Sequence, residues 1–449
     1  MQRRDRVELL KKIVLCSENK NLNNMDMKNN YRDKGRSMIL PIKENIQGIM
    51  AFLFFAFLLS IKSGYNIPAI MSLLIFFVFF KEIEWGRLSR LEVFFAFCFL
   101  VFALLWGWGF DNGTIIQGIN DYFYKYIIAI FVFIAAIFVK VKKKYYISGL
   151  IVGCMLTFCI AAWQFKGVGR AEGFTNAIRF GNLSLWMSCA CLIFAMVGES
   201  SLKTRVALVV SAMFGIFASF LSLSRGGWIF IFILPFIFFV FYEDKIKGAK
   251  VIIFSLFAIC VLAFFAAQIP FVEKRIVQAK TEVVSYLDGN PGSAATSVGA
   301  RLEQWSLAWR MGWDKPILGW GEHGYIDGRQ QYVAEGKADP TVVNFGHSHN
   351  EFLNVFAKKG LVGVFGLILV YLAPILLFWP RKACMKSLDT CRVKDYKAVC
   401  LVGLSIPLAY AVFGLTEYFF YLNIGHIFYI FSIVYTYSLM KSTQEGLYV

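Results

Sequence analysis

A series of long apolar runs is the feature that most constrains this chain. Hydrophobic residues make up 58% of its 449 residues and charged residues only 17%, whereas about a quarter of the residues in a soluble domain are charged. A helix crosses the hydrocarbon core of a bilayer with about 20 apolar residues. Run length and composition therefore predict an all-α integral membrane protein with about twelve membrane spans. The predicted spans cover residues 46–62, 66–81, 92–109, 125–140, 146–164, 180–197, 205–222, 228–242, 250–270, 352–379, 398–415 and 424–440.

One long polar segment, residues 271–351, interrupts this pattern between the ninth and tenth predicted spans. We expect it to form a large loop outside the membrane that contains short amphipathic helices. The chain then divides into an N-terminal arm (1–45), a first group of spans (46–270), the polar loop, a second group of spans (352–440) and a short tail (441–449). The arm is polar and rich in Asn and Lys, which is typical of a poorly ordered cytoplasmic segment.

Basic residues indicate how the chain is inserted. If the spans alternate, the N-terminal arm and four basic loops lie on one side of the membrane, and by the positive-inside rule that side is the cytoplasm. The basic residues of the four loops are Lys140, Lys142, Lys143, Lys144, Lys203, Arg205, Lys245, Lys247, Lys250, Arg381, Lys382, Lys386, Arg392, Lys394 and Lys397. The polar loop would then be periplasmic in a multi-pass protein of the bacterial inner membrane. Topology thus accounts for most of the net charge of +17, and we expect no nucleic-acid partner.

Two turns on the predicted outer face each carry an arginine. Arg225 stands in the turn 222–228, whose Gly226 and Gly227 would let the backbone approach a ligand closely and leave N–H groups free. Arg170 stands in a glycine-rich loop on the same face. Each side chain could clamp a phosphate through two hydrogen bonds. Arg225 could instead extend from the end of a span to the lipid headgroups.

A third arginine, Arg301, begins a predicted helix in the polar loop. Trp305, Trp309 and Trp313 follow at intervals of four residues, so that all four side chains share one helix face. Tryptophan prefers the membrane interface, and this helix could therefore lie on the bilayer with Arg301 at headgroup level. Alternatively, it is an amphipathic packing helix with an exposed arginine.

The polar loop closes with two histidines, His347 and His349, which are followed by Asn350. Because imidazole titrates near neutral pH, a histidine here could accept the proton of an attacking hydroxyl group. We assign this role to His349, which directly precedes the tenth span, with Asn350 orienting its ring. His349 could also cap the tenth helix.

The same two histidines could instead hold a metal ion together with Glu351. Further ligands are not obvious in the sequence beyond Glu322 and His323, and the chain contains no Asp-x-Asp motif. We therefore expect neither a metal nor another cofactor.

Arginines and a histidine at one membrane face suit a specific reaction. Arg170, Arg225 and Arg301 could bind a pyrophosphate and stabilise the charge that develops on it as a leaving group, in place of a metal. The histidine would deprotonate the attacking hydroxyl group. This is the outline of glycosyl transfer from a polyprenyl-pyrophosphate donor, with membrane lipids surrounding both substrates.

Three motifs resemble the O-antigen ligase family, which shares a superfamily with O-antigen polymerases and protein O-oligosaccharyltransferases. They are Ser-Arg-Gly-Gly at 224–227, Gly-Ala-Arg-Leu-x-x-Trp at 299–305 and Gly-His-Ser-His-Asn-Glu-Phe-Leu at 346–353. The resemblance implies metal-independent transfer of a complete O-antigen glycan from undecaprenyl pyrophosphate to a sugar hydroxyl of lipid A-core. The donor and this acceptor would be the partners of the chain.

The resemblance also implies roles for individual residues. It makes Arg225 and Arg301 the arginines that hold the donor pyrophosphate and His349 the catalytic base. Because of their position at the same face, we add Arg170, His347 and Asn350 to the predicted substrate-binding residues.

Three other functions remain open. A polymerase would use a second lipid-linked unit as the acceptor, and a protein O-oligosaccharyltransferase would use a protein. A secondary transporter would also fit the number of spans, but it predicts ionisable residues and broken helices within the membrane. Glu417 and His426, near the last outer turn, and Arg225 are the few ionisable residues of this kind in the sequence.

Overall fold

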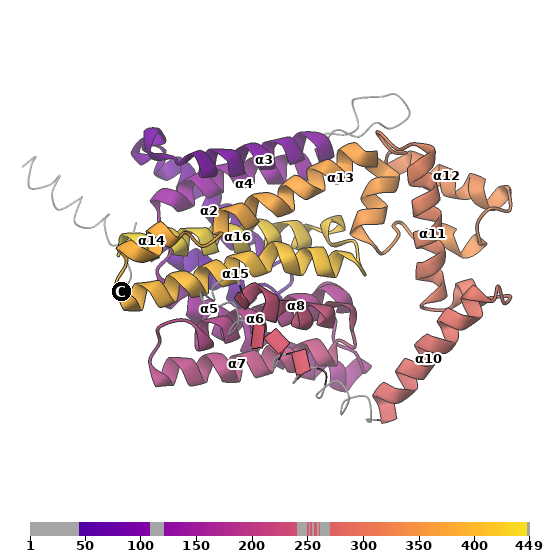
Figure 1. The fold of residues 1–449 in the computed structure, drawn as a ribbon, viewed down its shortest axis with the longest axis horizontal. Helices are drawn as coiled ribbons and strands as arrows, with labels where there is room; N and C mark the ends of the chain where they lie inside the picture. Colours follow the sequence, from indigo (N-terminus) through magenta and orange to yellow (C-terminus); the bar gives the residue numbers. More distant parts are fainter. Residues whose placement is uncertain are drawn as a thin grey trace, which may run out of the picture.

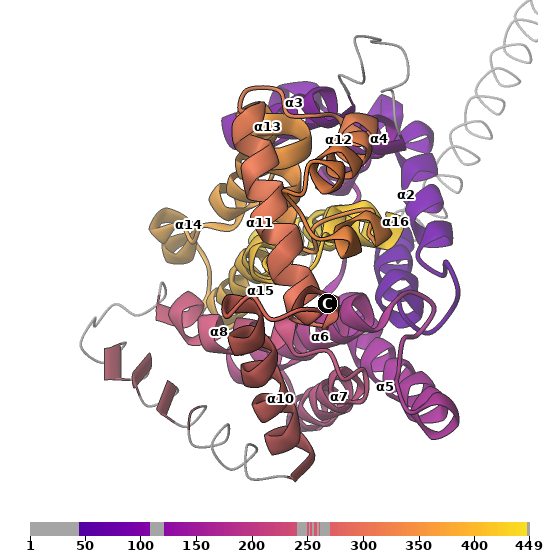
Figure 2. The ribbon, with the colours of Figure 1, turned by 90° about the vertical axis from the view of Figure 1, so that its right-hand side faces the viewer.

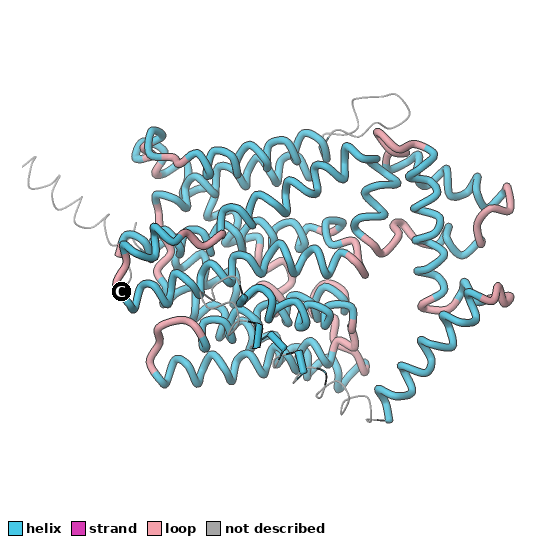
Figure 3. Tube along the Cα trace, viewed as in Figure 1, coloured by secondary structure: helices cyan, strands magenta, loops and turns pink. Residues whose placement is uncertain are grey.

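The computed structural model describes residues 45–107, 121–239 and 270–446, together with short pieces between 249 and 260. Within these ranges the chain forms helices and turns and no strand, which confirms the all-α fold (Figure 3). The helices of the bundle are Asn45–Phe57, α2 (Asn66–Val78), α3 (Arg90–Gly107), α4 (Asp121–Phe138), α5 (Lys143–Val168), α6 (Ala177–Met196), α7 (Leu202–Leu221), α8 (Ile229–Phe239), α13 (Glu351–Phe378), α14 (Lys382–Ser387), α15 (Thr390–Gly414) and α16 (Asn423–Glu445). The polar segment forms α10 (Pro270–Leu287), η5 (Ser293–Ala295), α11 (Gly299–Asp314), α12 (Glu322–Ala334) and η6 (Pro340–Asn344). Shorter turns of helix are η1 (Phe80–Glu82), η2 (Trp85–Arg87), η4 (Gly226–Trp228) and η7 (Phe419–Tyr421).

The observed helices follow the predicted spans. Each predicted span other than 250–270 overlaps one helix of the bundle, and most of 250–270 lies outside the described residues. Among the described residues, five helices are long and apolar enough to cross a membrane, namely α5, α6, α7, α15, and α13 continued through α14. Four further helices are apolar but shorter: Asn45–Phe57, α2, α8 and the greater part of α4. A multi-span membrane protein is thus supported, while the number twelve stays a prediction.

The polar segment and the basic loops lie at opposite ends of the bundle (Figure 1). Helices α10, α11 and α12 are at the right-hand end, and α14 is at the left-hand end. Ion pairs join the basic loops at the left-hand end: Lys143 lies 2.6 Å from Asp395, and Lys394 lies 2.7 Å from Glu199. This separation is what the positive-inside rule requires of a polar loop that faces away from the cytoplasm.

Helices α6, α15 and α16 are largely buried, and they position the segments that carry the candidate site described below. Aromatic rings fill the space between them; Tyr410 of α15 stacks on Phe428 of α16 with a centroid distance of 6.1 Å, and Trp186 of α6 meets Phe428 edge-on at 5.1 Å. The Trp186 indole also donates a 3.0 Å hydrogen bond to Ser405. The turn between α15 and α16 and the start of α6 are therefore held in the middle of one end of the bundle.

Helix α13 is broken at Gly360, although the sequence predicted one continuous span over 352–379. Gly360 has φ 61°, and a Cβ atom there would lie 2.3 Å from the carbonyl oxygen of Ile317. The α11–α12 connection fits into the break, where the amide of Leu361 donates to the carbonyl of Pro316 at 2.7 Å. Only glycine allows this backbone conformation and this close approach at once.

Helix α11 lies across the end of the bundle, as Figure 2 shows from that side. Its inner face contributes Leu307 and Met311 to a small core that it shares with α12 and the start of α13. The helix predicted around the tryptophans is confirmed. Trp309 and Trp313 contact Phe356 of α13 at 5.8 and 5.4 Å, and more than half of each side chain stays exposed. Their position on a bilayer remains a prediction.

Candidate active site

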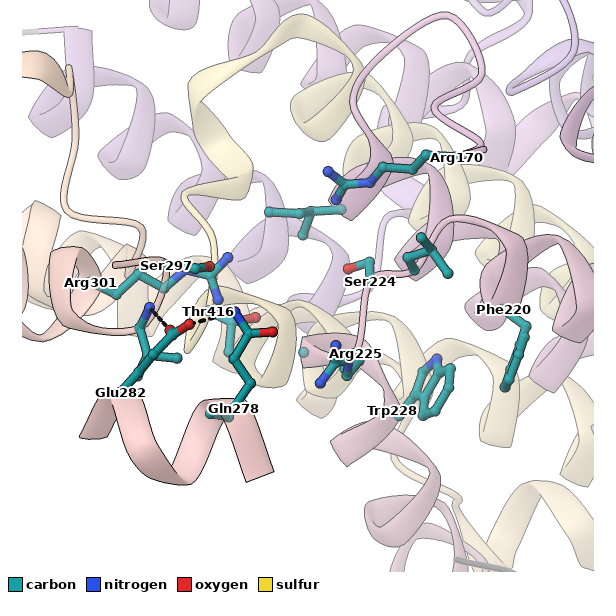
Figure 4. Close-up of a pocket in the computed structure, with 15 residues that line it drawn as sticks. Arg170, Phe220, Ser224, Arg225, Trp228, Gln278, Glu282, Ser297, Arg301 and Thr416 are labelled. Atoms are coloured by element: carbon teal, nitrogen blue, oxygen red, sulfur yellow. Dashed lines mark hydrogen bonds between the residues drawn. The ribbon is translucent and has the colours of Figure 1, made fainter. Parts of the chain in front are cut away.

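Three arginines line one cavity of about 380 Å³ between the bundle and the polar segment (Figure 4). Arg170 comes from the loop after α5, Arg225 from the turn before α8, and Arg301 from the first turn of α11. The structure therefore brings together all three arginines that the sequence placed on one face. The remaining polar lining residues are Ser224, Gln278, Glu282, Ser297 and Thr416.

The turn that carries Arg225 is set by close packing. A Cβ atom on Gly226 would lie 2.2 Å from the hydroxyl oxygen of Thr416, and one on Gly227 would lie 2.1 Å from the amide oxygen of Asn182. The sequence predicts that these glycines let a ligand approach the backbone closely. In the structure they allow the turn to lie directly against α6 and the α15–α16 turn, which fixes Arg225 beside both.

The cavity favours an anion, with one opposing charge. Arg170 donates a 3.1 Å hydrogen bond to the Ser222 carbonyl, which ties its loop to the Arg225 turn. The N-terminal end of α11 also faces the cavity and adds the positive end of its helix dipole. Glu282 is the opposing carboxylate, and it accepts a 3.0 Å hydrogen bond from the amide of Val298.

The histidines form a second, adjacent cluster. The Nδ1 atom of His349 lies 3.2 Å from one carboxylate oxygen of Glu417, and the other oxygen lies 3.0 Å from the guanidinium of Arg179. Arg179 also donates a 2.7 Å hydrogen bond to the Tyr418 carbonyl. The result is a chain of contacts from α6 through Glu417 to His349, in which Arg179 and Glu417 are almost fully buried.

His349 has an unusual backbone conformation, with φ 52°. A non-glycine residue in the left-handed region costs of the order of 1–3 kcal/mol, and such strain is frequent at active sites. Asn350 holds the segment in place, because it caps α13 by accepting from the Leu353 amide at 3.1 Å and donates to the Leu415 carbonyl at 3.2 Å. Asn350, rather than His349, is thus the cap of this helix.

His347 supports this geometry through its neutral ring. Burial lowers the pKa of His347 to about 4, and the neighbouring His349 adds to this effect. Its Nδ1 atom accepts a 3.2 Å hydrogen bond from the His349 amide. Burial would raise the pKa of Glu417, but the His349 hydrogen bond and the Arg179 charge outweigh it and lower that pKa below its usual value. The cluster therefore pairs a neutral His347 with an ionised Glu417 at neutral pH.

One turn joins the cavity and the histidine cluster. Thr416 lines the arginine cavity, while its neighbours Leu415 and Glu417 bind Asn350 and His349. His347, His349 and Asn350 are not part of the cavity lining. They stand beside it.

The sequence reasoning missed Arg179 and gave Glu417 no role in the site. Arg179 lies one residue before a predicted span, and Glu417 was noted only as an ionisable residue near an outer turn. A charged residue at the edge of the membrane is costly unless it has a partner. This cost could have marked both residues as functional. Their pairing could not be predicted from the sequence, because they are 238 positions apart.

The cluster also bears on the metal hypothesis. Donor atoms of His347, His349 and Glu417 lie within 4.8 Å of one another, so Glu417 supplies the third ligand that the sequence had sought in Glu322 or His323. Glu322 instead pairs with Lys358 at 2.5 Å. The cluster suits a metal poorly, because Arg179 already neutralises Glu417 and the Nδ1 lone pair of His347 is occupied.

Comparisons with known proteins agree with the motifs. Residues 206–368 match the family described as O-antigen ligase, and this range contains Arg225, Arg301 and both histidines. A protein from Haemophilus influenzae (strain ATCC 51907 / DSM 11121 / KW20 / Rd), described as uncharacterized, is 28% identical over 391 residues, which cover 85% of this chain and 95% of that protein. The match over residues 206–368 supports the resemblance to the O-antigen ligase family that the motifs predicted.

Proposed function

We propose that the chain is an O-antigen ligase of the bacterial inner membrane. It transfers O-antigen polysaccharide from undecaprenyl pyrophosphate to a sugar hydroxyl of lipid A-core, on the periplasmic side. The observation that carries this proposal is the meeting of Arg170, Arg225 and Arg301 in one cavity beside His349, within and next to a domain of the ligase family.

The arginine cavity would bind the donor. A pyrophosphate carries several negative charges, and Arg225 and Arg301 can each present two N–H groups to it. As the bond between the anomeric carbon and the phosphate oxygen breaks, the electron pair moves onto the pyrophosphate. Arginines aimed at that oxygen stabilise the developing charge.

The histidine cluster would activate the acceptor. His349 takes the proton from the acceptor hydroxyl as its oxygen bonds to the anomeric carbon. Undecaprenyl pyrophosphate leaves, and the proton on His349 passes to solvent. The atoms and charges balance without a metal or another cofactor.

The break in α13 and the buried charges are also features of transporters. In this chain the break is occupied by the α11–α12 connection of the polar segment, and the charges surround the histidines at the same end of the bundle. This arrangement favours chemistry at one membrane face. A ligase and a polymerase differ in the acceptor: a ligase uses lipid A-core, and a polymerase uses a second lipid-linked unit.

Lipopolysaccharide from a deletion strain tests the proposal. Loss of a ligase leaves polymerised glycan on undecaprenyl pyrophosphate and lipid A-core without O-antigen. Loss of a polymerase instead leaves core that carries a single repeat unit, and that gel pattern would contradict the proposal. The wild-type gene must restore the long ladder, and the Arg225→Ala gene must not.

A further inference from the structure

We propose that Glu417 positions His349 as the catalytic base, and that Arg179 holds Glu417 in place. This inference rests on the proposed function, since it assigns roles to two residues that act through the base. Both are positioning residues, because neither lines the arginine cavity in which the donor would bind.

The geometry of the carboxylate carries the inference. Glu417 is 1% exposed, and its two oxygens face different partners: Oε2 faces His349 Nδ1 at 3.2 Å, and Oε1 faces Arg179 at 3.0 Å. Arg179 is itself 2% exposed and also binds the backbone of Tyr418. The carboxylate therefore cannot rotate without losing a buried ion pair.

A fixed carboxylate selects one form of the imidazole. With Nδ1–H donating to Glu417, the lone pair of His349 is on Nε2, which is the atom left to accept the acceptor proton. When Nε2 takes that proton, the ring becomes positive, and Glu417 supplies its counter-charge. The proton never moves to Glu417, whose own pKa lies below its usual value because of the His349 hydrogen bond and the Arg179 charge, which outweigh burial.

Other titratable and charged groups around the pair determine how it responds to pH. They are His347, Arg179, Glu351 and Lys358. Arg179 is engaged by Glu417, and Lys358 by Glu322. Glu417 is thus the carboxylate in direct contact with the His349 ring among the described residues.

The test measures transfer by the purified full-length protein, with undecaprenyl-pyrophosphate-linked glycan as donor and lipid A-core as acceptor. Glu417→Gln keeps the shape of the side chain but removes its charge. We expect kcat to fall at least about 10- to 100-fold, the range for carboxylates that orient a metal-bound histidine, with KM for the donor unchanged. The acid limb of the kcat profile should also move to lower pH, because the protonated ring has lost its counter-charge.

Glu92→Gln is the matched control. Glu92 is also 1% exposed and ion-paired, with Lys441 at 3.1 Å. Lys441 is near the C-terminal end of α16, whereas Glu417 precedes the start of that helix, so Glu92 lies at the opposite end of the bundle. Its loss should lower the melting temperature and leave the pH profile unchanged.

The outcomes are distinguishable. If Glu417→Gln has an unchanged kcat and pH profile and His349→Ala is inactive, the role of Glu417 is overturned and the proposed function stands. Activation of the wild type by a divalent metal, lost in Glu417→Gln, would also overturn it and make Glu417 a ligand. If Glu417→Gln does not fold, Glu417→Asp keeps the charge beside Arg179 but shortens its reach, so an undiminished kcat there would contradict the role. A wild-type protein that transfers no glycan at all would refute the proposed function itself.

Discussion

The arginine cavity and the histidine cluster are neighbours, yet they are built in opposite ways. Arg170 and Arg225 are exposed, Arg301 is half-buried, and the three come from separate segments around a space of about 380 Å³. His349, by contrast, is fixed by a buried carboxylate, a strained backbone and a capped helix. A site that must admit a large, charged lipid needs room, whereas a proton transfer needs atoms held to within a fraction of an ångström. The contrast suggests that the cavity governs donor binding and leaving-group departure, and that the cluster governs proton transfer.

The largest expected effect separates the two histidines. General-base removal costs about a hundred- to ten-thousand-fold in rate, so His349→Ala should lose nearly all transfer and keep donor binding. His347→Ala should lose less, because His347 supports His349 through one backbone hydrogen bond. Transfer with lipid-linked glycan and lipid A-core measures both. His323→Ala, on the exposed face of α12, is the control and should behave as the wild type. A dead His347→Ala beside an active His349→Ala would reverse the assignment.

The next effect tests the cavity. Arg225→Ala and Arg301→Ala should each reduce kcat by about a hundred- to a thousand-fold, the range seen when one donor to a developing charge is removed. They should also weaken donor binding, which His349→Ala should not. Lysine should rescue poorly, since it cannot form two parallel hydrogen bonds.

Arg310→Ala provides the matched control for Arg301. Arg310 lies on the same helix but binds the Lys337 carbonyl, away from the cavity. Full activity in Arg301→Ala would reduce that arginine to a surface charge.

A smaller effect should appear in stability rather than activity. Burial lowers the pKa of His347 to about 4, whereas a histidine in an unfolded chain titrates near about 6.5. Between these values the unfolded chain binds a proton that the folded protein does not. Stability from this residue is therefore complete above about pH 6.5 and declines as the pH falls toward 4.

His347→Gln removes this contribution. In detergent, the melting temperature should differ less between neutral and mildly acidic pH in the variant than in the wild type. An equal acid-induced decrease in both would contradict a buried, neutral His347.

The smallest expected effect is that of a chelator. His347, His349 and Glu417 stand close enough for a metal, but Arg179 occupies the other side of Glu417. EDTA should leave transfer by the purified enzyme unchanged. If EDTA inactivates the enzyme and one divalent metal restores it, the histidine cluster would be a metal site that acts together with the arginine cavity.

The cavity was largely predictable from sequence, whereas only the histidines and Asn350 of the cluster were predictable. Arg225, Arg301 and His349 are conspicuous because each is a polar residue within a recognisable motif at the end of a span or a helix. Arg179 and Glu417 belong to no such motif, and their meaning comes from a tertiary contact across the bundle. The break at Gly360 was also missed, although Lys358, Lys359 and Gly360 within an apolar run are unusual in an uninterrupted span.

That break has a consequence for building hybrid proteins. The amides of Leu361 and Val362 are satisfied by Pro316 and Ile317, and the backbone of Gly319 lies against that of Lys358. Any exchange of the polar segment between relatives must therefore carry residues 316–319 and 358–362 as one set. A graft that ends at the apparent loop boundary, residue 351, would combine residues 316–319 of one protein with residues 358–362 of another. The amides at the break in α13 could then lose their hydrogen-bond acceptors.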